Sequence, residues 1–228
     1  MQYEKPRYRL MGDRSVLVEL GDEISPLVNQ KVRGLLVGLD HQKMDGILEL
    51  VPGYRSLLVV FNPLEIELES LKGKIENAVG QLDSSRLAPP RTIEIPVAYG
   101  DEYGPDLEWV AEFQKMTGEE VVQLHTEPLY RVYMIGFMPG FPYLGEVPDA
   151  LVTPRRETPR THVPQGSVAI AQKQTGIYPV ESPGGWQIIG RTPIRLFDPE
   201  KKKPSLLQMG DQVKFYAISK EDMQKWQS

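Results

Sequence analysis

The sequence predicts an α+β domain followed by a mainly-β domain. Residues 9–82 alternate between strand-like and helix-like apolar patterns, whereas residues 130–218 contain many short apolar segments bounded by glycine and proline. Between these regions, residues 83–91 (DSSRLAPPR) are polar and contain a proline pair, which is typical of a linker. We therefore expect two domains, comprising residues 1–85 and residues 86–228.

The first domain is predicted to run strand, helix, strand, strand, helix. Ser25 is a candidate N-cap and Pro26 suits the first turn of the first helix. A Pro-Gly-Tyr turn separates the two middle strands. This order indicates a small sandwich of ferredoxin-like type. Its elements are expected at residues 9–20, 27–39, 47–51, 56–61 and 65–82.

The second domain is predicted to begin with a strand and two helices and to continue as β structure. In the first of these helices Leu107, Val110 and Phe113 share one face, and Gly118 is expected to end it. Many short strands joined by glycine- and proline-rich turns favour a barrel or a sandwich. The strands are expected at residues 92–98, 131–137, 167–171, 187–191, 194–198 and 212–218, with helices at 106–117, 119–125 and in the tail from 220.

Composition narrows the function classes. The 228 residues have a net charge of −5, which argues against general nucleic-acid binding. Cysteine is absent, which excludes disulfides and thiolate chemistry and fits a cytoplasmic location. No apolar run reaches membrane-spanning length, so no membrane association is expected. With three histidines and no cysteine, a metal site is not expected either.

A proline-stiffened basic segment, TPRRETPRTHVP, is the first candidate site. Guanidinium groups suit carboxylate or phosphate recognition, and an imidazole can move protons near neutral pH. The alternative is that the arginines pair with neighbouring acids such as Glu157 while the histidine caps a loop. A fourth arginine follows on a later strand. The candidates are Arg155, Arg156, Arg160 and Arg191, with His162.

The glycine-rich segment that follows is the second candidate. Gly184 and Gly185 can bring backbone N–H groups to a ligand oxygen, and nearby Glu181 and Tyr178 offer a proton acceptor and a hydroxyl. Trp186 can form the apolar wall of a pocket. The alternative is a tight hairpin in which the glycines serve the turn and Trp186 fills the core, which for the tryptophan alone is favoured.

The third candidate is GFMPGFPYLG at residues 136–145. Its aromatic side chains, Phe137, Phe141 and Tyr143, can line a substrate groove or dock a partner protein. The alternative is an apolar plug that joins the two domains.

Together and in this order, these motifs resemble the 5-oxoprolinase B-subunit family, also called kinase A inhibitor-like or allophanate hydrolase subunit 1. The similar stretches are GFMPGFPYLG, PRRETPRTHVPQGSVAIAQKQTGIYP, SPGGWQIIGRTP and LFDPEKKKPSLLQMGDQVKF. GDRSVLVELGD and VPGYRSLLVVF match more loosely in the first domain.

The resemblance implies a cyclophilin-like barrel for the second domain. It further implies a subunit of an ATP-dependent enzyme that opens 5-oxoproline to L-glutamate together with subunits A and C. ATP would then be the cofactor of the complex, whichever subunit binds it. The alternative function is a regulatory protein that binds and inhibits a sensor histidine kinase.

On this resemblance we hypothesise a division of roles in a site for a small anionic substrate. One of the four arginines would hold the substrate carboxylate or a phosphorylated oxygen. His162 or Glu181 would act as general base, and the amides of Gly184 and Gly185 would stabilise negative charge. The chain alone is expected to be inactive, its site being completed by the C subunit.

Overall fold

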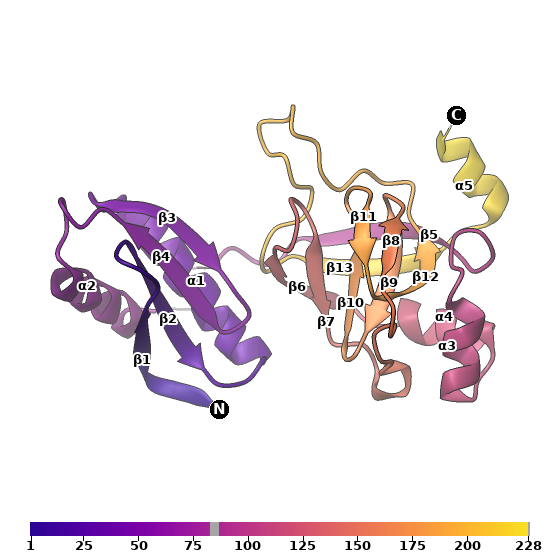
Figure 1. The fold of residues 1–228 in the computed structure, drawn as a ribbon, viewed down its shortest axis with the longest axis horizontal. Helices are drawn as coiled ribbons and strands as arrows, with labels where there is room; N and C mark the ends of the chain where they lie inside the picture. Colours follow the sequence, from indigo (N-terminus) through magenta and orange to yellow (C-terminus); the bar gives the residue numbers. More distant parts are fainter. Residues whose placement is uncertain (83–86, 228) are drawn as a thin grey trace. The chain divides into compact units, whose positions relative to one another are not determined.

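The computed structural model describes residues 1–82 and 87–227, which fall into two compact units, Met1–Pro89 and Pro90–Ser228 (Figure 1). The predicted domain boundary at 85/86 lies outside the described residues. Each unit is described by itself below.

The first unit is a four-stranded antiparallel sheet with two helices. The strand order is β1-β2-β4-β3, and alternate residues of β2 and β4 are buried beside the apolar faces of the helices. The elements are β1 (Gln2–Leu10), β2 (Ser15–Gly21), α1 (Pro26–Gln42), β3 (Ile47–Pro52), β4 (Ser56–Phe61) and α2 (Leu68–Gly80).

The predicted order of strand, helix, strand, strand and helix is present as β2 to α2. β1 is an additional strand that the pattern did not reveal, because it lies at the sheet edge and most of its side chains are exposed. The ferredoxin-like classification stays a prediction.

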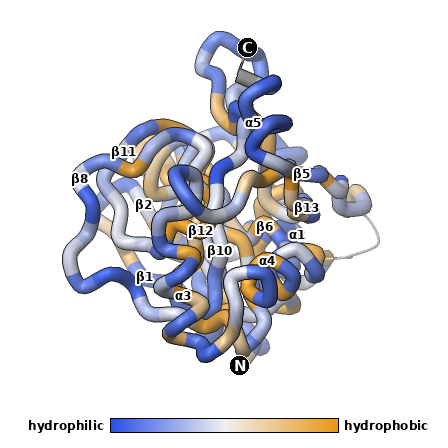
Figure 2. Tube along the Cα trace, turned by 90° about the vertical axis from the view of Figure 1, so that its right-hand side faces the viewer, coloured by the Kyte–Doolittle hydropathy of each residue, from blue (hydrophilic) through white to orange (hydrophobic). Residues whose placement is uncertain are grey.

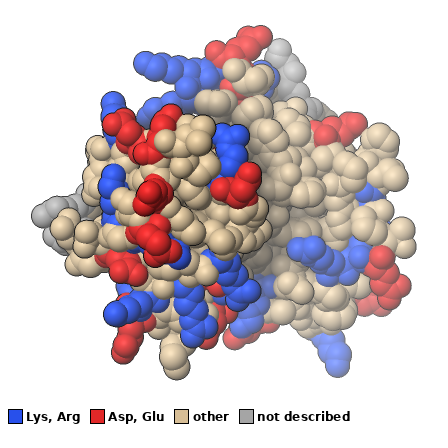
Figure 3. All heavy atoms as spheres, turned by 60° about the vertical axis from the view of Figure 1, so that its left-hand side comes forward, with Lys and Arg blue, Asp and Glu red and all other residues tan. Residues whose placement is uncertain are grey.

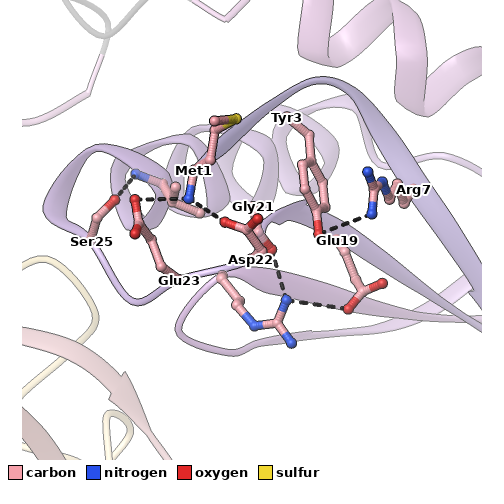
Figure 4. Close-up of polar contacts among 10 residues, drawn as sticks. Met1, Tyr3, Arg7, Glu19, Gly21, Asp22, Glu23 and Ser25 are labelled. Atoms are coloured by element: carbon pink, nitrogen blue, oxygen red, sulfur yellow. Dashed lines mark hydrogen bonds and ion pairs between the residues drawn. The ribbon is translucent and has the colours of Figure 1, made fainter.

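Local polar contacts fix the start of α1. Ser25 is its N-cap, as predicted, and the Val28 N–H donates to Ser25 Oγ at 3.2 Å. Just before it, the Met1 ammonium pairs with Asp22 and, at 2.8 Å, with Glu23 (Figure 4). Acidic and basic side chains are intermingled on the face that Figure 3 presents.

The second unit contains a closed seven-stranded barrel of order β10-β7-β6-β13-β5-β12-β9. The pair β5–β13 is parallel and the other pairs are antiparallel. The sequence pattern left barrel and sandwich open, and the structure is a barrel; its cyclophilin-like classification stays a prediction. The strands are β5 (Thr92–Tyr99), β6 (Tyr130–Ile135), β7 (Pro142–Gly145), β9 (Ser167–Ala171), β10 (Gln174–Ile177), β12 (Gln187–Arg191) and β13 (Gln212–Ala217).

Apolar side chains fill the barrel. Its core includes Ile95 from β5, Val132 from β6 and Phe215 from β13, all fully buried. Figure 2 shows the apolar stretches on inner strands such as β6, β10 and β12, and polar stretches on α5 and β8. One expected strand is wrong: residues 194–198 form only an isolated bridge between Phe197 and Ser205.

Three helices accompany the barrel: α3 (Leu107–Gln114), α4 (Gly118–Thr126) and α5 (Lys220–Gln227). Two details of the predicted first helix are wrong. Phe113 is exposed, because the buried face of α3 is Leu107, Val110 and Ala111. Gly118 begins α4 rather than ending α3, since Thr117 and Glu120 form a capping box there.

Candidate binding face on the barrel

A two-stranded ribbon that is separate from the barrel sheet carries part of the candidate site. It pairs β8 (Arg160–Val163) with β11 (Ser182–Gly184) in antiparallel register. Between the ribbon and the barrel wall lies a second apolar core, distinct from the barrel interior. This core comprises Phe141, Val163, Ala169, Ala171, Tyr178, Trp186 and Ile188.

Phe141 is the centre of the aromatic side chains in that core. Its ring centroid lies 4.9 Å from that of Tyr143, 5.2 Å from that of Tyr178 and 5.5 Å from that of Trp186. Because Phe141 and Trp186 are buried, they shape the surface rather than offer it to a ligand. Tyr143 is half-buried, and Phe137 is 66% exposed at a positive φ of 67°. Of the predicted groove residues, only the last two reach the surface.

Asp106, at the N-terminus of α3, holds two of the candidate arginines. Arg160 donates to both of its carboxylate oxygens, at 2.8 and 2.7 Å, and Arg156 donates to Oδ1 at 2.9 Å. The backbone N–H of Ile188 donates to Oδ2 at 2.7 Å. Asp106 is 4% exposed, so these four charge-assisted bonds replace its hydration.

The predicted pairing of arginines with an acid is therefore present, although the acid is Asp106 and not Glu157. Arg156 and Arg160 tie the proline-rich segment to α3 and β12 through this carboxylate. Asp106 was missed because it precedes Arg156 by 50 residues. The only local signal was its place before a helix, where aspartate is also a common cap.

Arg155 differs from its two neighbours. It is exposed, and no side-chain hydrogen bond or ion pair engages it within the described residues. Its charge acts on two tyrosines: burial raises the pKa of Tyr143 and of Tyr178, and the positive charge of Arg155 opposes both shifts. Arg155 thus lies at the edge of the aromatic core with its guanidinium free for an anion.

Arg191 lies elsewhere on the barrel. It is on β12, where its guanidinium carbon is 5.8 Å from the centroid of the Tyr103 ring. It shares no hydrogen-bond or ion-pair partner with the other three arginines in the described part of the chain. The four candidate arginines therefore do not form one cluster, and a substrate-binding role for Arg191 stays a prediction.

The predicted acid–base residues do lie together. Nδ1 of His162 on β8 is 3.2 Å from Oε1 of Glu181, the residue before β11, and both side chains are exposed. A carboxylate at this distance orients the imidazole and favours its charged form. The pair can exchange a proton with a ligand bound against the ribbon.

The paired glycines have different surroundings. A Cβ at Gly184 would lie 2.3 Å from the hydroxyl oxygen of Tyr178, so glycine is required there by packing. At Gly185 a Cβ would meet only Pro159, at 3.5 Å, and the Gly185 carbonyl accepts from the Arg156 N–H at 2.8 Å. Packing thus explains Gly184, and roles for both glycines and for Tyr178 in substrate binding stay predictions.

A groove of about 590 Å³ opens beside the arginines. One side is formed by Trp109 and Phe113 of α3, whose rings stack at 5.3 Å and are 43% and 49% exposed. The other side is residues 154–158, and Gln187 of β12 completes the lining. Neither α3 aromatic was among the residues predicted from the sequence. Their spacing of four residues, which places them side by side on a helix, was the available signal.

His125 on α4 belongs to the barrel interior and not to the candidate site. Thr175 donates its hydroxyl proton to the Ala169 carbonyl at 3.1 Å, so Thr175 Oγ1 accepts from His125 Nε2 at 2.8 Å. Nδ1 then accepts from the Tyr99 hydroxyl, also at 2.8 Å. Burial lowers the pKa of His125 to about 3. This histidine is neutral, fully paired and structural.

Two further features of the described residues concern metals and membranes. No three histidine, aspartate or glutamate side chains gather there as metal ligands would. Nor does any helix in residues 1–82 and 87–227 have both the length and the apolarity to cross a bilayer.

Comparison with known proteins identifies relatives over most of the chain. Residues 6–207 match the family described as carboxyltransferase domain, subdomain C and D. The B subunit of the 5-oxoprolinase of Bacillus subtilis (strain 168) is 40% identical over 228 residues, covering 95% of each chain. The B subunit of the 5-oxoprolinase of Haemophilus influenzae is 51% identical over 174 residues, covering 76% of this chain and 81% of that protein.

A solved structure gives the same picture. The crystal structure of TTHA0988 superposes with a TM-score of 0.82 at 38% identity and covers 90% of this chain. This chain spans only 40% of the length of TTHA0988.

Proposed function

The chain belongs to the 5-oxoprolinase B-subunit family, and on that premise we propose that it is one subunit of an ATP-dependent 5-oxoprolinase. The complex opens the lactam ring of 5-oxo-L-proline to L-glutamate with ATP hydrolysis and contains subunits A and C. The observation that carries the proposal is the 40–51% identity to proteins named as the B subunit of 5-oxoprolinase. Those names favour the enzyme subunit over the kinase-inhibitor alternative.

The geometry suits a small anionic substrate. Arg155 supplies a free cation beside the aromatic core, and Arg156 and Arg160 add positive charge while Asp106 fixes their positions. The pair His162–Glu181 supplies the general base. We assign ATP to the complex and give no residue of this chain a role towards it.

The exposed position of the acid–base pair supports the expectation that the chain is inactive alone. A general base works best where water is excluded, and both members of this pair face solvent. A partner subunit that covers the β8–β11 ribbon would exclude that water. We assign this cover to the C subunit.

The test is ATP-dependent glutamate release from 5-oxoproline by the complex of this chain with co-expressed subunits A and C. The wild-type complex is expected to turn over, and His162→Ala is expected to lower kcat by about 100-fold or more. His41→Ala, an exposed histidine in the first unit, is the matched control and should leave kcat unchanged. Full activity of His162→Ala would remove the assigned base, and an inactive wild-type complex would contradict the proposed enzyme.

A further inference from the structure

Two buried polar atoms of residues that line the groove beside α3 have no partner. Gln187 is 2% exposed, and its Nε2 donates to the Pro154 carbonyl at 3.1 Å, which identifies the other atom as the acceptor Oε1. Oε1 makes no hydrogen bond, and neither does Nε of Arg156, although both atoms are buried. One is an acceptor and the other a donor, and such atoms are rarely left unpaired.

An acceptor and a donor offered to one groove are complementary to the edge of a cyclic amide. In a small lactam ring the amide is held cis, so its N–H and C=O project from the same edge. An open-chain amide is trans and presents them on opposite edges. A lactam N–H can therefore donate to Gln187 Oε1 while its carbonyl oxygen accepts from Arg156 Nε.

The rest of the groove suits the remaining parts of such a ligand. The stacked rings of Trp109 and Phe113 offer an apolar surface for a small ring. Arg155 also lines the groove and has its guanidinium free for a carboxylate. Glu157, which lines the groove too, is the one feature that opposes an anion.

We propose that this groove binds a small lactam carboxylate by the cis-amide edge of its ring, with Arg155 on the carboxylate. The choice of 5-oxoproline as that ligand rests on the proposed function. The site is distinct from the ribbon pair His162–Glu181. It assigns Trp109, Phe113 and Gln187, which no sequence motif indicated, to substrate binding.

The experiment is a titration of the full chain with L-5-oxoproline, followed by ¹⁵N–¹H spectra that resolve the indole of Trp109. The Trp109 indole is expected to shift, with the control indole of Trp226 on α5 unmoved. The lactone analogue lacks the N–H, and proline lacks the lactam carbonyl. Each is expected to bind at least about tenfold more weakly.

Variants sharpen the assignment. Gln187→Met and Arg155→Gln should each weaken binding about tenfold or more, while Arg14→Gln, an exposed arginine of the first unit, should not. Glu157→Gln should tighten binding, because it removes the opposing charge. No shift at Trp109, equal affinity for the lactone, or wild-type affinity of Gln187→Met would each overturn the proposal. Protection of Trp109 by a partner subunit without any lactam-induced shift would also overturn it, in favour of a protein contact.

This test fails separately from that of the proposed function. If the complex turns over 5-oxoproline with full kcat/KM in Gln187→Met and Arg155→Gln, the function stands and the groove assignment falls. If the groove binds the lactam but the wild-type complex releases no glutamate, the groove stands and the function falls.

Discussion

The interior of the barrel and its outer side beside β8 and α3 hold their polar groups in opposite ways. Inside, both ring nitrogens of His125 are paired with hydroxyl groups that are themselves placed by the strands. Outside, Asp106 pairs two arginines, yet buried atoms of Arg156 and Gln187 stay unpaired and Arg155 is free. The same fold therefore saturates polar groups where it needs a unique packing and leaves them open where a ligand can complete them.

The largest effect is expected from removing the carboxylate that anchors the outer side. Asp106→Ala leaves two guanidinium groups and the Ile188 N–H without their acceptor, and should lower the free energy of unfolding by about 3 kcal/mol. Urea-induced unfolding monitored by near-UV circular dichroism measures this. Asp149→Ala removes an exposed carboxylate near Lys173 and should change stability by less than about 0.5 kcal/mol. Equal effects of the two variants would contradict the anchoring role.

The interior predicts a pH dependence. His125 has a folded pKa of about 3 against 6.5 when unfolded, so the unfolded chain binds the extra proton between these values. Its contribution to stability is full above pH 6.5 and declines as the pH falls. At pH 5 the loss should be about 2 kcal/mol.

The measurement is the difference in unfolding free energy between pH 7 and pH 5 for wild type and His125→Gln. The variant should lack about 2 kcal/mol of this difference, because glutamine does not titrate. His162→Ala, which removes an exposed histidine, should keep the wild-type difference. A His125→Gln protein with the wild-type pH dependence would show that this histidine is not buried in the neutral form.

A smaller effect is expected where the ribbon packs on its apolar core. Gly184→Ala places a methyl group against the Tyr178 hydroxyl and should destabilise by about 1–3 kcal/mol. Gly185→Ala, which has room for a methyl group, should be nearly neutral. Thermal unfolding compares the two variants. Equal melting temperatures would indicate that Tyr178 moves aside freely.

The smallest effect concerns the exposed end of the aromatic cluster. Phe137 is exposed, so Phe137→Ala should change the free energy of unfolding by no more than about 0.5 kcal/mol. If it contacts a partner, the same variant should weaken co-purification with subunits A and C. Wild-type recovery of the complex would remove Phe137 from the candidate partner surface.

Much of the fold was predictable, because it depends on local signals. The N-cap Ser25 and the periodicity of α1, the strand pair β3–β4, and the strands β5, β9, β12 and β13 all follow from neighbouring residues. Segments that the pattern missed, such as β8 and β11, are short and lie among prolines and glycines, whose strand propensity is low. They form because Val163 and Tyr178 pack beneath them, a long-range contact that no local pattern records.

The candidate site was predictable only in part, for a similar reason. The basic segment and the pair His162–Glu181 stand out by residue type, and the second of these does form a contact. Which arginine is free depends on Asp106, and the groove depends on Trp109 and Gln187, all brought together by tertiary packing. Residue type indicated the chemistry, and the fold determined which groups remain available for it.

Two adjacent arginines divide the work of the site: Arg155 serves a ligand, and Arg156 serves both the ligand and the fold. The most direct measurement is kcat/KM for 5-oxoproline of the complex carrying Arg155→Gln, together with the unfolding free energy of that variant. We predict a loss in kcat/KM of about tenfold or more with unchanged stability. Wild-type kcat/KM in a stable Arg155→Gln complex would contradict the account.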